Sequence, residues 1–353
     1  MNGNKCNWGK IVTNKDASWL STWKNPINKK PVYTRINRNF DPWVGRNDYQ
    51  KFEKARDLNS KINKIRKKYI KDLKDPSKIE FALAVYLLDK IAIRPGTEKG
   101  DEGTRGLTTL KCENIKWNDK QNTIIINFIG KSSIQFKKKI KLDEYIYALL
   151  RNNCSGKKSS PLFPHVNAKT LNEYLGSLSK GLTAKVFRTW KASSEVDKQL
   201  QKIKLKKNAD LQEKKVAFFN ANIKAALELN HKRMTDNTEK VQKILDKIKK
   251  LTKELEKSKT PTQKRNKRNA ISTAKLKLNE AENNVNIGTS KANYIDPRII
   301  VSWAKRHDVP IEAIYKTSND RKRFIWAMEI PSTWSFNKST KKTKFSRNKS
   351  KKK

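Results

Sequence analysis

Five residues spread along the 353-residue chain are of types that can act chemically together: Arg94, Lys131, Arg188, His231 and Tyr294. A tyrosine phenol can serve as an oxygen nucleophile, and guanidinium groups offer planar forks of donors to charged oxygens. Lysine and histidine can donate protons or hydrogen bonds. Taken one at a time, each has an ordinary structural explanation, such as a helix-end ion pair for Arg94 or a packed ring for Tyr294. The residue types alone therefore leave their role open.

The charge balance of the chain points to a polyanionic partner. It has 81 lysines and arginines against 34 acidic residues, which gives a formal net charge of +47. Residues 337–353 contain nine basic residues and no acid, so +38 would remain without them and the folded part is itself basic. Neutralising phosphates releases condensed counterions, so affinity should be high at low salt and fall steeply as salt rises. DNA or RNA fits this charge better than a membrane surface does.

Composition also limits the class of protein. Hydrophobic residues make up 35% of the chain and nine are tryptophan, which indicates one or two modest cores. The three cysteines, Cys6, Cys112 and Cys154, are an odd number in no metal-binding spacing, and the sequence shows no signal peptide or long apolar run. We therefore expect a reducing intracellular compartment and no membrane partner. Without a Cys/His cluster or an acidic triad, we expect no protein-held metal.

The apolar pattern of the first hundred residues predicts strands and then helices. Residues 1–47 mix tryptophan with proline, asparagine and lysine, which favours short strands and loops. Residues 48–73 repeat apolar side chains every three or four positions, as an amphipathic helix does. A more apolar helix is predicted over residues 77–93, ending at the proline and glycine that follow Arg94. Arg94 is therefore expected at the end of a buried helix.

Further β segments and helices are predicted downstream. β-rich segments occupy residues 107–110, 115–117, 123–129 and 133–140. The last two are joined through Gly130, Lys131 and Ser132, which predicts a hairpin. Helices are expected over residues 143–152, 168–180, 183–204 and 212–232.

A heptad-like apolar stripe over residues 234–286 predicts two antiparallel helices. The stripe breaks at the Thr-Pro-Thr run of residues 260–262, and the basic string KRNKR is expected at the tip of this protruding hairpin. Residues 288–315 are predicted to form a compact helical unit, and the lysine-rich tail after it is expected to be disordered.

The strings around the five candidate residues are more specific than the residues themselves. In chain order they are LLDKIAIRPGTEKG, FIGKSSI, GLTAKVFRTWKAS, LNHKR and IGTSKANYIDPRIIVSW, with the helical hairpin between the fourth and the fifth. In these strings the chain resembles the eukaryotic, nuclear type IB DNA topoisomerases. The resemblance covers residues 8–326, including WLSTWKNPI and NDYQKFEKARDLNSKINKIRKKY near the start.

The resemblance implies a fold of the α+β class, mainly α. It is a catalytic domain of the tyrosine recombinase/topoisomerase IB type with a small antiparallel sheet, a protruding antiparallel coiled-coil linker and a small helical C-terminal unit. The chain would divide into N-terminal strands, loops and a connecting helix (1–75), a catalytic core (76–232), the linker (233–286), the C-terminal domain with the nucleophile (287–330) and a disordered basic tail (331–353).

The same resemblance implies an isomerase that relaxes supercoiled double-stranded DNA. Tyr294 would cleave one strand and hold its 3′ phosphate, the free end would rotate, and the strand would be resealed. Arg94, Arg188 and His231 would stabilise the transition state, and Lys131 would be the general acid, its pKa lowered by nearby cations. No cofactor is expected, because the phosphotyrosine keeps the bond energy without ATP and arginines act in place of a metal ion.

Three further positions match DNA-proximal positions of the family: Lys185, Asn222 and Asn293. Lys185 stands three residues before Arg188, in KVFR, where tyrosine recombinases typically carry histidine. It would be a base or a phosphate contact, or else one more surface lysine. Asn222 and Asn293 would lie close to DNA, or would serve only helix and loop packing.

The resemblance stops at the N-terminus. Larger members carry an extensive cap before the equivalent of Trp8, and this chain begins only a few residues earlier. Three explanations stay open: a second polypeptide supplies the cap, the reading frame is truncated, or the catalytic lobe works as an open clamp. The alternatives for function are a tyrosine recombinase or integrase, and a catalytic subunit that is inactive without a cap-bearing partner.

The C-terminal run KSTKKTKFSRNKSKKK is similar to a nuclear import signal, though disordered basic tails have the same composition. We expect the protein in the nucleus, or at the site of viral DNA replication if the source is a virus.

Overall fold

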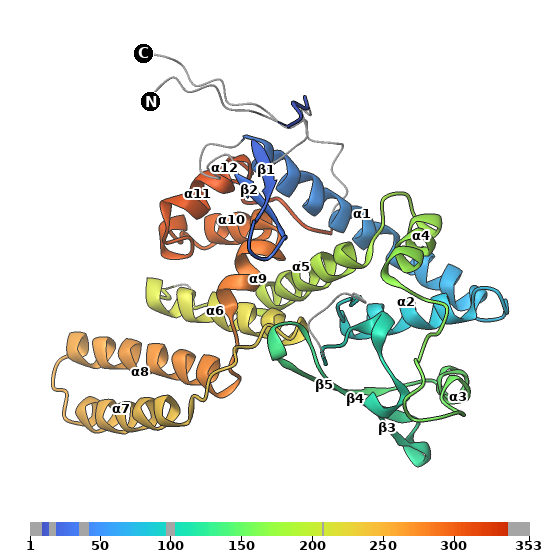
Figure 1. The fold of residues 1–353 in the computed structure, drawn as a ribbon. Helices are drawn as coiled ribbons and strands as arrows, with labels where there is room; N and C mark the ends of the chain where they lie inside the picture. The colour runs from blue at the N-terminus through green and yellow to red at the C-terminus, as the bar shows by residue number, and fades with distance from the viewer. Residues whose placement is uncertain (1–8, 14–18, 35–41, 97–102, 207, 338–353) are drawn as a thin grey trace.

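The structure is a computed structural model that describes residues 9–13, 19–34, 42–96, 103–206 and 208–337. Most of these residues are helical, and two small antiparallel sheets lie apart from each other among the helices (Figure 1). The predicted mainly helical α+β class is therefore confirmed.

A short hairpin and one long helix form the N-terminal part. Strands β1 (Ser21–Lys24) and β2 (Pro31–Thr34) pair antiparallel. Helix α1 (Pro42–Asp72) begins earlier than the predicted start at residue 48. The predicted amphipathic face is confirmed, because the apolar side chains of the repeat are all buried: Phe52, Ala55, Leu58, Ile62, Ile65 and Tyr69.

Helix α2 (Ile79–Ile91) is buried along most of its length. It ends at Ala92, whose φ of 47° turns the chain before the predicted proline and glycine stop. The amide of Ala92 still closes the last turn by donating to the Leu88 carbonyl at 2.9 Å. Arg94 follows this turn directly, as expected for a residue at a buried helix end.

Strands β3 (Ile115–Asn118), β4 (Thr123–Ile129) and β5 (Gln135–Lys141) form one antiparallel sheet in that order. The predicted β4–β5 hairpin is confirmed, and its turn is a short 3-10 segment over Lys131–Ser133. Alternate β4 side chains are buried, because successive residues of a strand face opposite sides. These are Ile124, Ile126 and Phe128.

The prediction of a strand over residues 107–110 is wrong. Residues Leu107–Thr109 form a 3-10 turn instead. The Thr109 hydroxyl accepts the Gly106 amide at 2.9 Å, so the segment satisfies its own backbone locally and does not extend as a strand.

Four helices complete the core: α3 (Glu144–Asn153), α4 (Ala168–Leu178), α5 (Ala184–Lys202) and α6 (Leu211–Glu228). All four match the predicted positions, but α6 stops before the predicted end at residue 232. Asn230 adopts a φ of 53°, a left-handed conformation that continues no helix. The chain therefore turns immediately before His231.

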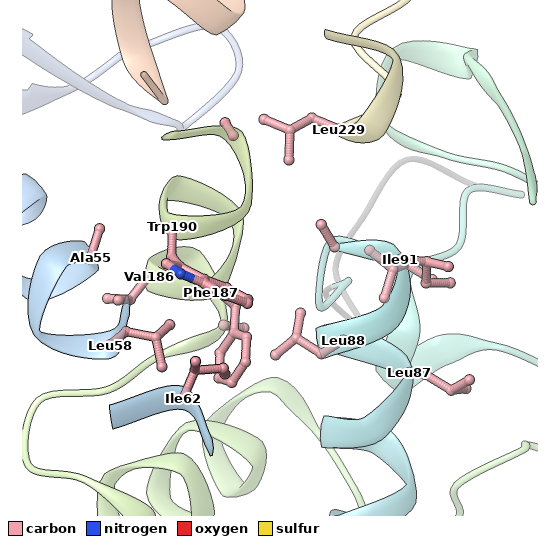
Figure 2. Packing of buried hydrophobic residues seen from close by; sticks show 14 of the residues in the cluster. Ala55, Leu58, Ile62, Leu87, Leu88, Ile91, Val186, Phe187, Trp190 and Leu229 are labelled. Carbon is pink, nitrogen blue, oxygen red and sulfur yellow. The ribbon is translucent and has the colours of Figure 1, made fainter. Parts of the chain in front are cut away.

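The central packing joins α1, α2 and α5. Figure 2 shows Phe187 and Val186 of α5 facing Leu58 and Ile62 of α1, with Leu88 of α2 on the opposite side. A hydrogen bond reinforces this apolar contact, because the Trp190 indole donates to the Asn59 amide oxygen at 2.8 Å. Helix α5 is thus fixed between α1 and α2.

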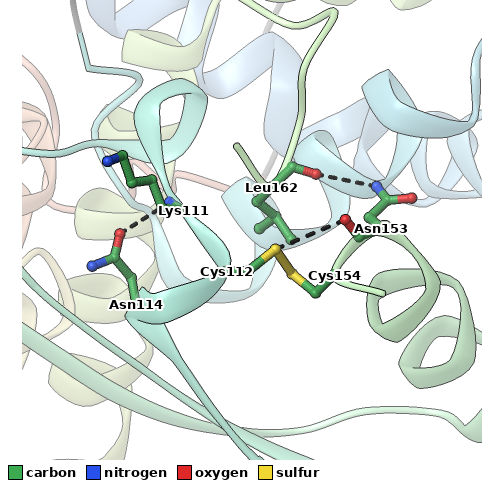
Figure 3. The surroundings of a disulfide bond; sticks show 6 residues. All are labelled: Lys111, Cys112, Asn114, Asn153, Cys154 and Leu162. Atoms are coloured by element: carbon green, nitrogen blue, oxygen red, sulfur yellow. Dashed lines mark hydrogen bonds between the residues drawn. A yellow bond between two sulfur atoms is a disulfide. The ribbon is translucent and has the colours of Figure 1, made fainter. Parts of the chain in front are cut away.

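A disulfide joins Cys112, just before β3, to Cys154 at the end of α3 (Figure 3). This bond was not predicted from the sequence, which led us to expect a reducing compartment. The two cysteines are 42 residues apart in the sequence, so the tertiary structure brings them together. Cys6 lies outside the described residues.

Helices α7 (Thr238–Glu256) and α8 (Pro261–Glu282) form the expected antiparallel hairpin (Figure 1). The string KRNKR was predicted at the tip of the hairpin, and this placement is wrong. It lies in the first turns of α8. Helix α8 also packs against α6 along much of its length: Gln212 donates to Thr273 at 2.7 Å, and Asn279 donates to Asn220 at 3.2 Å. The hairpin is therefore anchored to the core through α8, while α7 has no buried residue.

The C-terminal unit contains α9 (Ile287–Asn293), α10 (Pro297–Arg306), α11 (Ser318–Arg323) and α12 (Ile325–Met328). Residues 331–337, expected to begin the disordered tail, are packed instead, with Trp334 8% and Phe336 2% exposed. The rest of the predicted tail, residues 338–353, lies outside the described residues.

Arg298 attaches the C-terminal unit to α1. It is 2% exposed, forms a two-pronged ion pair with Asp296 at 2.8 and 3.0 Å, and donates to Glu53 of α1 at 2.6 Å. A buried charge is tolerated only when it is paired in this way. Its guanidinium also lies over three aromatic rings, those of Tyr49, Trp326 and Trp334.

None of the helices in the described ranges combines the length and apolar character needed to cross a bilayer.

Candidate active site

Arg188 is the centre of the site. Helix α5 presents it inward, 3% exposed, where it donates to the carbonyl of Ala92 and, at 3.2 Å, to that of Leu229. These two carbonyls lie at the ends of α2 and α6, so one guanidinium joins three segments. Burial lowers the pKa of Arg188 to about 10, against the opposing effect of Tyr294, so the group stays charged at neutral pH.

His231 lies beside Arg188. The turn at Asn230 directs its ring inward, where it is 3% exposed and its Nε2 lies 3.5 Å from a terminal guanidinium nitrogen of Arg188. Its backbone is held on both sides, because its amide donates to Ala226 at 2.8 Å and its carbonyl accepts from Asn286 at 2.7 Å. Burial, followed by the charges of Arg188 and Arg94, lowers the pKa of His231 to about 3. The imidazole is therefore neutral at neutral pH.

Tyr294 reaches this centre from the end of α9. Its ring centroid is 4.9 Å from that of His231 and 5.4 Å from the guanidinium carbon of Arg188. Burial alone would raise the pKa of the phenol, but the charges of Arg188, Arg94 and Lys185 outweigh it and leave that pKa below its usual value. A lowered pKa increases the fraction of phenolate, which is the nucleophilic form.

Arg94 completes the positive surroundings. It is partly exposed, and its charge acts on Tyr294, Arg188 and His231 alike. Its carbonyl accepts the Leu107 amide at 2.8 Å. The segment approaches Gly106 so closely that a Cβ there would lie 2.5 Å from a backbone atom of Gly96, which explains the glycines at this point.

Two buried polar atoms of the site, Nε of Arg188 and Nδ1 of His231, have no hydrogen-bond partner among the described residues. Such atoms are rare in folded proteins, because an unsatisfied buried group costs about 1–3 kcal/mol. Together with the surrounding cations they fit a centre that binds an anionic oxygen group.

Lys131 stands apart from this cluster. It is exposed in the β4–β5 turn, and no hydrogen bond or ion pair links its ammonium group to another described residue. The turn holds Ser132 and Ser133 at φ values of 61° and 55°, and the Gly130 amide closes it by donating to Ile134 at 2.8 Å. The lysine is thus displayed on a defined turn.

The three other predicted positions differ in their surroundings. Lys185 is exposed one turn before Arg188, and its charge reaches Tyr294. Asn293 is also exposed, next to Tyr294. Asn222 is fully buried in α6 and has both ends of its amide engaged, so in this conformation it faces protein on all sides.

Three residues that join the segments of the site were not predicted from the sequence: Ser193, Ser290 and Asn230. Each lies inside a string that had already been singled out, namely GLTAKVFRTWKAS, IGTSKANYIDPRIIVSW and LNHKR. Their position within those strings was the signal by which the sequence could have identified them. No group of three or more metal-ligating side chains occurs in the part of the chain that the structure describes.

These features define a class of protein: a mainly helical fold that gathers a tyrosine, a neutral histidine and two arginines in one largely buried centre. Two family descriptions match the sequence. "Eukaryotic DNA topoisomerase I, catalytic core" covers residues 41–266, and "C-terminal topoisomerase domain" covers residues 265–336. The chain therefore belongs to the eukaryotic DNA topoisomerase I family.

Individual relatives agree with this assignment. The chain is 35% identical to DNA topoisomerase 1 beta of Arabidopsis thaliana, over 94% of this chain and 40% of the relative. It is 32% identical to DNA topoisomerase 1 of Drosophila melanogaster, over 92% of this chain and 35% of the relative. A mitochondrial DNA topoisomerase I of Rattus norvegicus is also 32% identical, over 91% of this chain and 60% of the relative. The chain thus spans well under half of the first two relatives.

Proposed function

We propose that this chain is a type IB DNA topoisomerase, which relaxes supercoiled DNA through a 3′-phosphotyrosine intermediate on Tyr294. The observation that carries the proposal is the contact of the Tyr294 ring with both Arg188 and His231, in a field that lowers the pKa of the phenol. Membership of the topoisomerase I family favours this activity over that of a tyrosine recombinase.

In the cleavage step the phenolate oxygen of Tyr294 attacks a DNA phosphorus, a phosphorus–oxygen bond to the tyrosine forms, and the bond to the 5′ oxygen breaks. Arg94 and Arg188 would donate to the non-bridging oxygens, and His231 would add one hydrogen bond. Lys131, displayed on the β4–β5 turn, would give its proton to the leaving oxygen. Resealing reverses these transfers, so bond energy is retained without ATP.

Double-stranded DNA is the proposed partner. The net charge of +47 supports strong electrostatic binding, and exposed Lys185 and Asn293 flank the site on α5 and α9. We propose that both contact DNA there. A second polypeptide supplying the cap is a further proposal, since the larger relatives have additional sequence. The nucleus is the proposed compartment, although one relative carries a mitochondrial name.

We also propose that the α7–α8 hairpin acts as a coiled-coil linker that slows strand rotation by contacting DNA. Exposed lysines on α7, which has no buried residue, support this role. Replacing Lys240, Lys247 and Lys250 by glutamine should reduce the salt dependence of DNA binding and change the relaxation rate. The rate of strand cleavage at saturating DNA should stay the same, and loss of cleavage in this variant would contradict the proposal.

The decisive experiment is relaxation of supercoiled plasmid by the purified chain in EDTA without ATP. We expect positive and negative supercoils to relax, and Tyr294→Phe to be inactive. The matched control is Tyr315→Phe, because the Tyr315 hydroxyl is buried in the same unit without a hydrogen-bond partner among the described residues. A strict requirement for Mg²⁺ or ATP, or activity in Tyr294→Phe, would overturn the proposal. Activity only after addition of a cell extract would point to a cap-bearing partner.

A further inference from the structure

Ser193 of α5 is a fully buried serine whose hydroxyl touches the nucleophile segment twice. Its Oγ donates to the backbone carbonyl of Tyr294 at 3.0 Å and accepts from the backbone amide of Asp296 at 3.0 Å. One hydroxyl thus bridges the two peptide groups on either side of Ile295, which is itself fully buried.

These two backbone groups lie where helical hydrogen bonding stops. Tyr294 directly follows Asn293, the last residue of α9, and Asp296 precedes Pro297, the first residue of α10. Carbonyls at the end of a helix and amides at the start of the next have no partner within their own helices. Ser193 supplies both partners from outside, so it fixes the path of the chain between α9 and α10.

The same helix also carries Arg188. Ser193 follows it by five residues, a rise of about 7.5 Å along α5. Because α5 is packed between α1 and α2, it forms one rigid support for the guanidinium that contacts the Tyr294 ring and for the hydroxyl that holds the Tyr294 backbone.

We infer that Ser193 is a positioning residue for Tyr294, an inference that rests on the proposed function. The hydroxyl does not touch the phenol, so it leaves the protonation of Tyr294 unchanged. It determines where the ring stands relative to Arg188 and therefore how often the phenolate oxygen lies in line with a bound phosphorus. Small displacements of a reacting group reduce rates strongly, by roughly a hundredfold for 1 Å.

The test is single-turnover cleavage of a duplex oligonucleotide at saturating concentration, with wild type, Ser193→Ala and Ser193→Cys. The cysteine variant leaves no cavity and has only a weak donor, so it covers the case that alanine prevents folding. We expect both variants to cleave at least about tenfold more slowly than wild type. Their DNA affinity, measured in a Tyr294→Phe background, should stay within about twofold, and the pH profile of the rate should keep its midpoint.

Ser194→Ala is the matched control. Ser194 is the next residue on α5, and its hydroxyl donates to Asn59 of α1 instead of the nucleophile segment. This variant should cleave at the wild-type rate.

Three outcomes would overturn the inference. The first is a wild-type cleavage rate in folded Ser193→Ala or Ser193→Cys. The second is a shifted midpoint of the pH profile, which would mean that the hydroxyl acts on the phenol. The third is a loss of rate that matches the loss of folded protein in both variants. If wild type itself does not cleave, the proposed function fails. If wild type cleaves and the two Ser193 variants cleave at the same rate, the function stands and the inference alone fails.

Discussion

The side-chain amide of Asn230 donates to the backbone carbonyl of Gln135 at 3.0 Å. Asn230 immediately precedes His231, and Gln135 begins β5 directly after the turn that carries Lys131. The bond therefore connects the residue before the histidine to the hairpin that displays the lysine. A second link reinforces it, because Glu228 at the end of α6 pairs with Lys138 of β5 at 3.4 Å. These contacts tie the hairpin that displays Lys131 to the segment that carries His231.

Removing the Asn230 amide should loosen the hairpin and slow cleavage. Glycine is the informative replacement, because it tolerates the φ of 53° at this position and removes only the side chain. A single hydrogen bond contributes about 0.5–1.5 kcal/mol, so we expect Asn230→Gly to lower the single-turnover rate by up to about tenfold.

The matched control for this variant is Asn122→Gly, another asparagine with positive φ, at 47°, in the turn between β3 and β4. It should cleave at the wild-type rate. Equal rates for wild type and Asn230→Gly would show that the bond to Gln135 does not position Lys131.

Asn222 allows two roles to be separated. The family pattern suggested proximity to DNA, but the amide donates to the Ile287 carbonyl at 3.1 Å and accepts from the Ser290 hydroxyl at 2.8 Å. Ser290 in turn accepts the backbone amide of Tyr294 at 2.9 Å. If Asn222 acts through this chain of contacts, Asn222→Ala should slow cleavage about tenfold with unchanged DNA affinity.

A DNA contact would give the opposite pattern for Asn222→Ala, with weaker binding and a normal rate at saturating DNA. Asn220→Ala is the control on the same helix, because the Asn220 amide oxygen accepts from Asn279 of α8 instead of bonding to the segment around Tyr294. It should behave as wild type in both measurements.

His231 should make stability depend on pH. Its pKa falls from 6.5 to about 3 on folding, chiefly through burial, so the unfolded chain binds a proton between these values that the folded protein does not. The contribution of the neutral, buried imidazole to the unfolding free energy is fully present above pH 6.5. This contribution is lost as pH falls and is smaller by about 2 kcal/mol at pH 5.

We therefore expect the unfolding free energy of wild type to fall between pH 7 and 5 by about 2 kcal/mol more than that of His231→Gln. Urea unfolding of both proteins over this range measures the difference. Parallel curves would mean that His231 is protonated in the folded state, and its NMR signals would then titrate near neutral pH.

The Cys112–Cys154 bond should stabilise the fold without serving the site. Closing a loop of this length restricts the unfolded chain, and the entropic estimate for 42 residues is about 4 kcal/mol. Replacing both cysteines by serine should lower the unfolding free energy by up to that amount, and a reductant should lower wild type to the same level. The folded variant should cleave normally, because neither residue contacts Arg188, His231 or Tyr294. A reductant that leaves the stability of wild type unchanged would contradict the presence of the bond.

Local patterns predicted most of the elements. The repeat from Phe52 to Tyr69 predicted the buried face of α1, and the Gly-Lys-Ser link predicted the β4–β5 hairpin. Both succeeded because periodicity and turn residues act within a few positions of the chain. The predictions of a strand over residues 107–110 and of disorder over residues 331–337 were wrong for a different reason. The first segment is closed by a threonine hydroxyl, and the second packs because Trp334 and Phe336 find a surface formed by distant helices.

The sequence by itself determined the identity and order of Arg94, Lys131, Arg188, His231 and Tyr294, the strong positive charge, and the family to which the strings around them correspond. Only the tertiary structure decided which of these residues meet, that His231 is neutral, that Asn222 faces protein, and that Ser193 bonds the backbone of Tyr294 across 101 residues of chain. The physical reason is range. Helical and strand periods are local, whereas burial, hydrogen-bond partners and pKa shifts depend on how α5, α6 and α9 pack against one another.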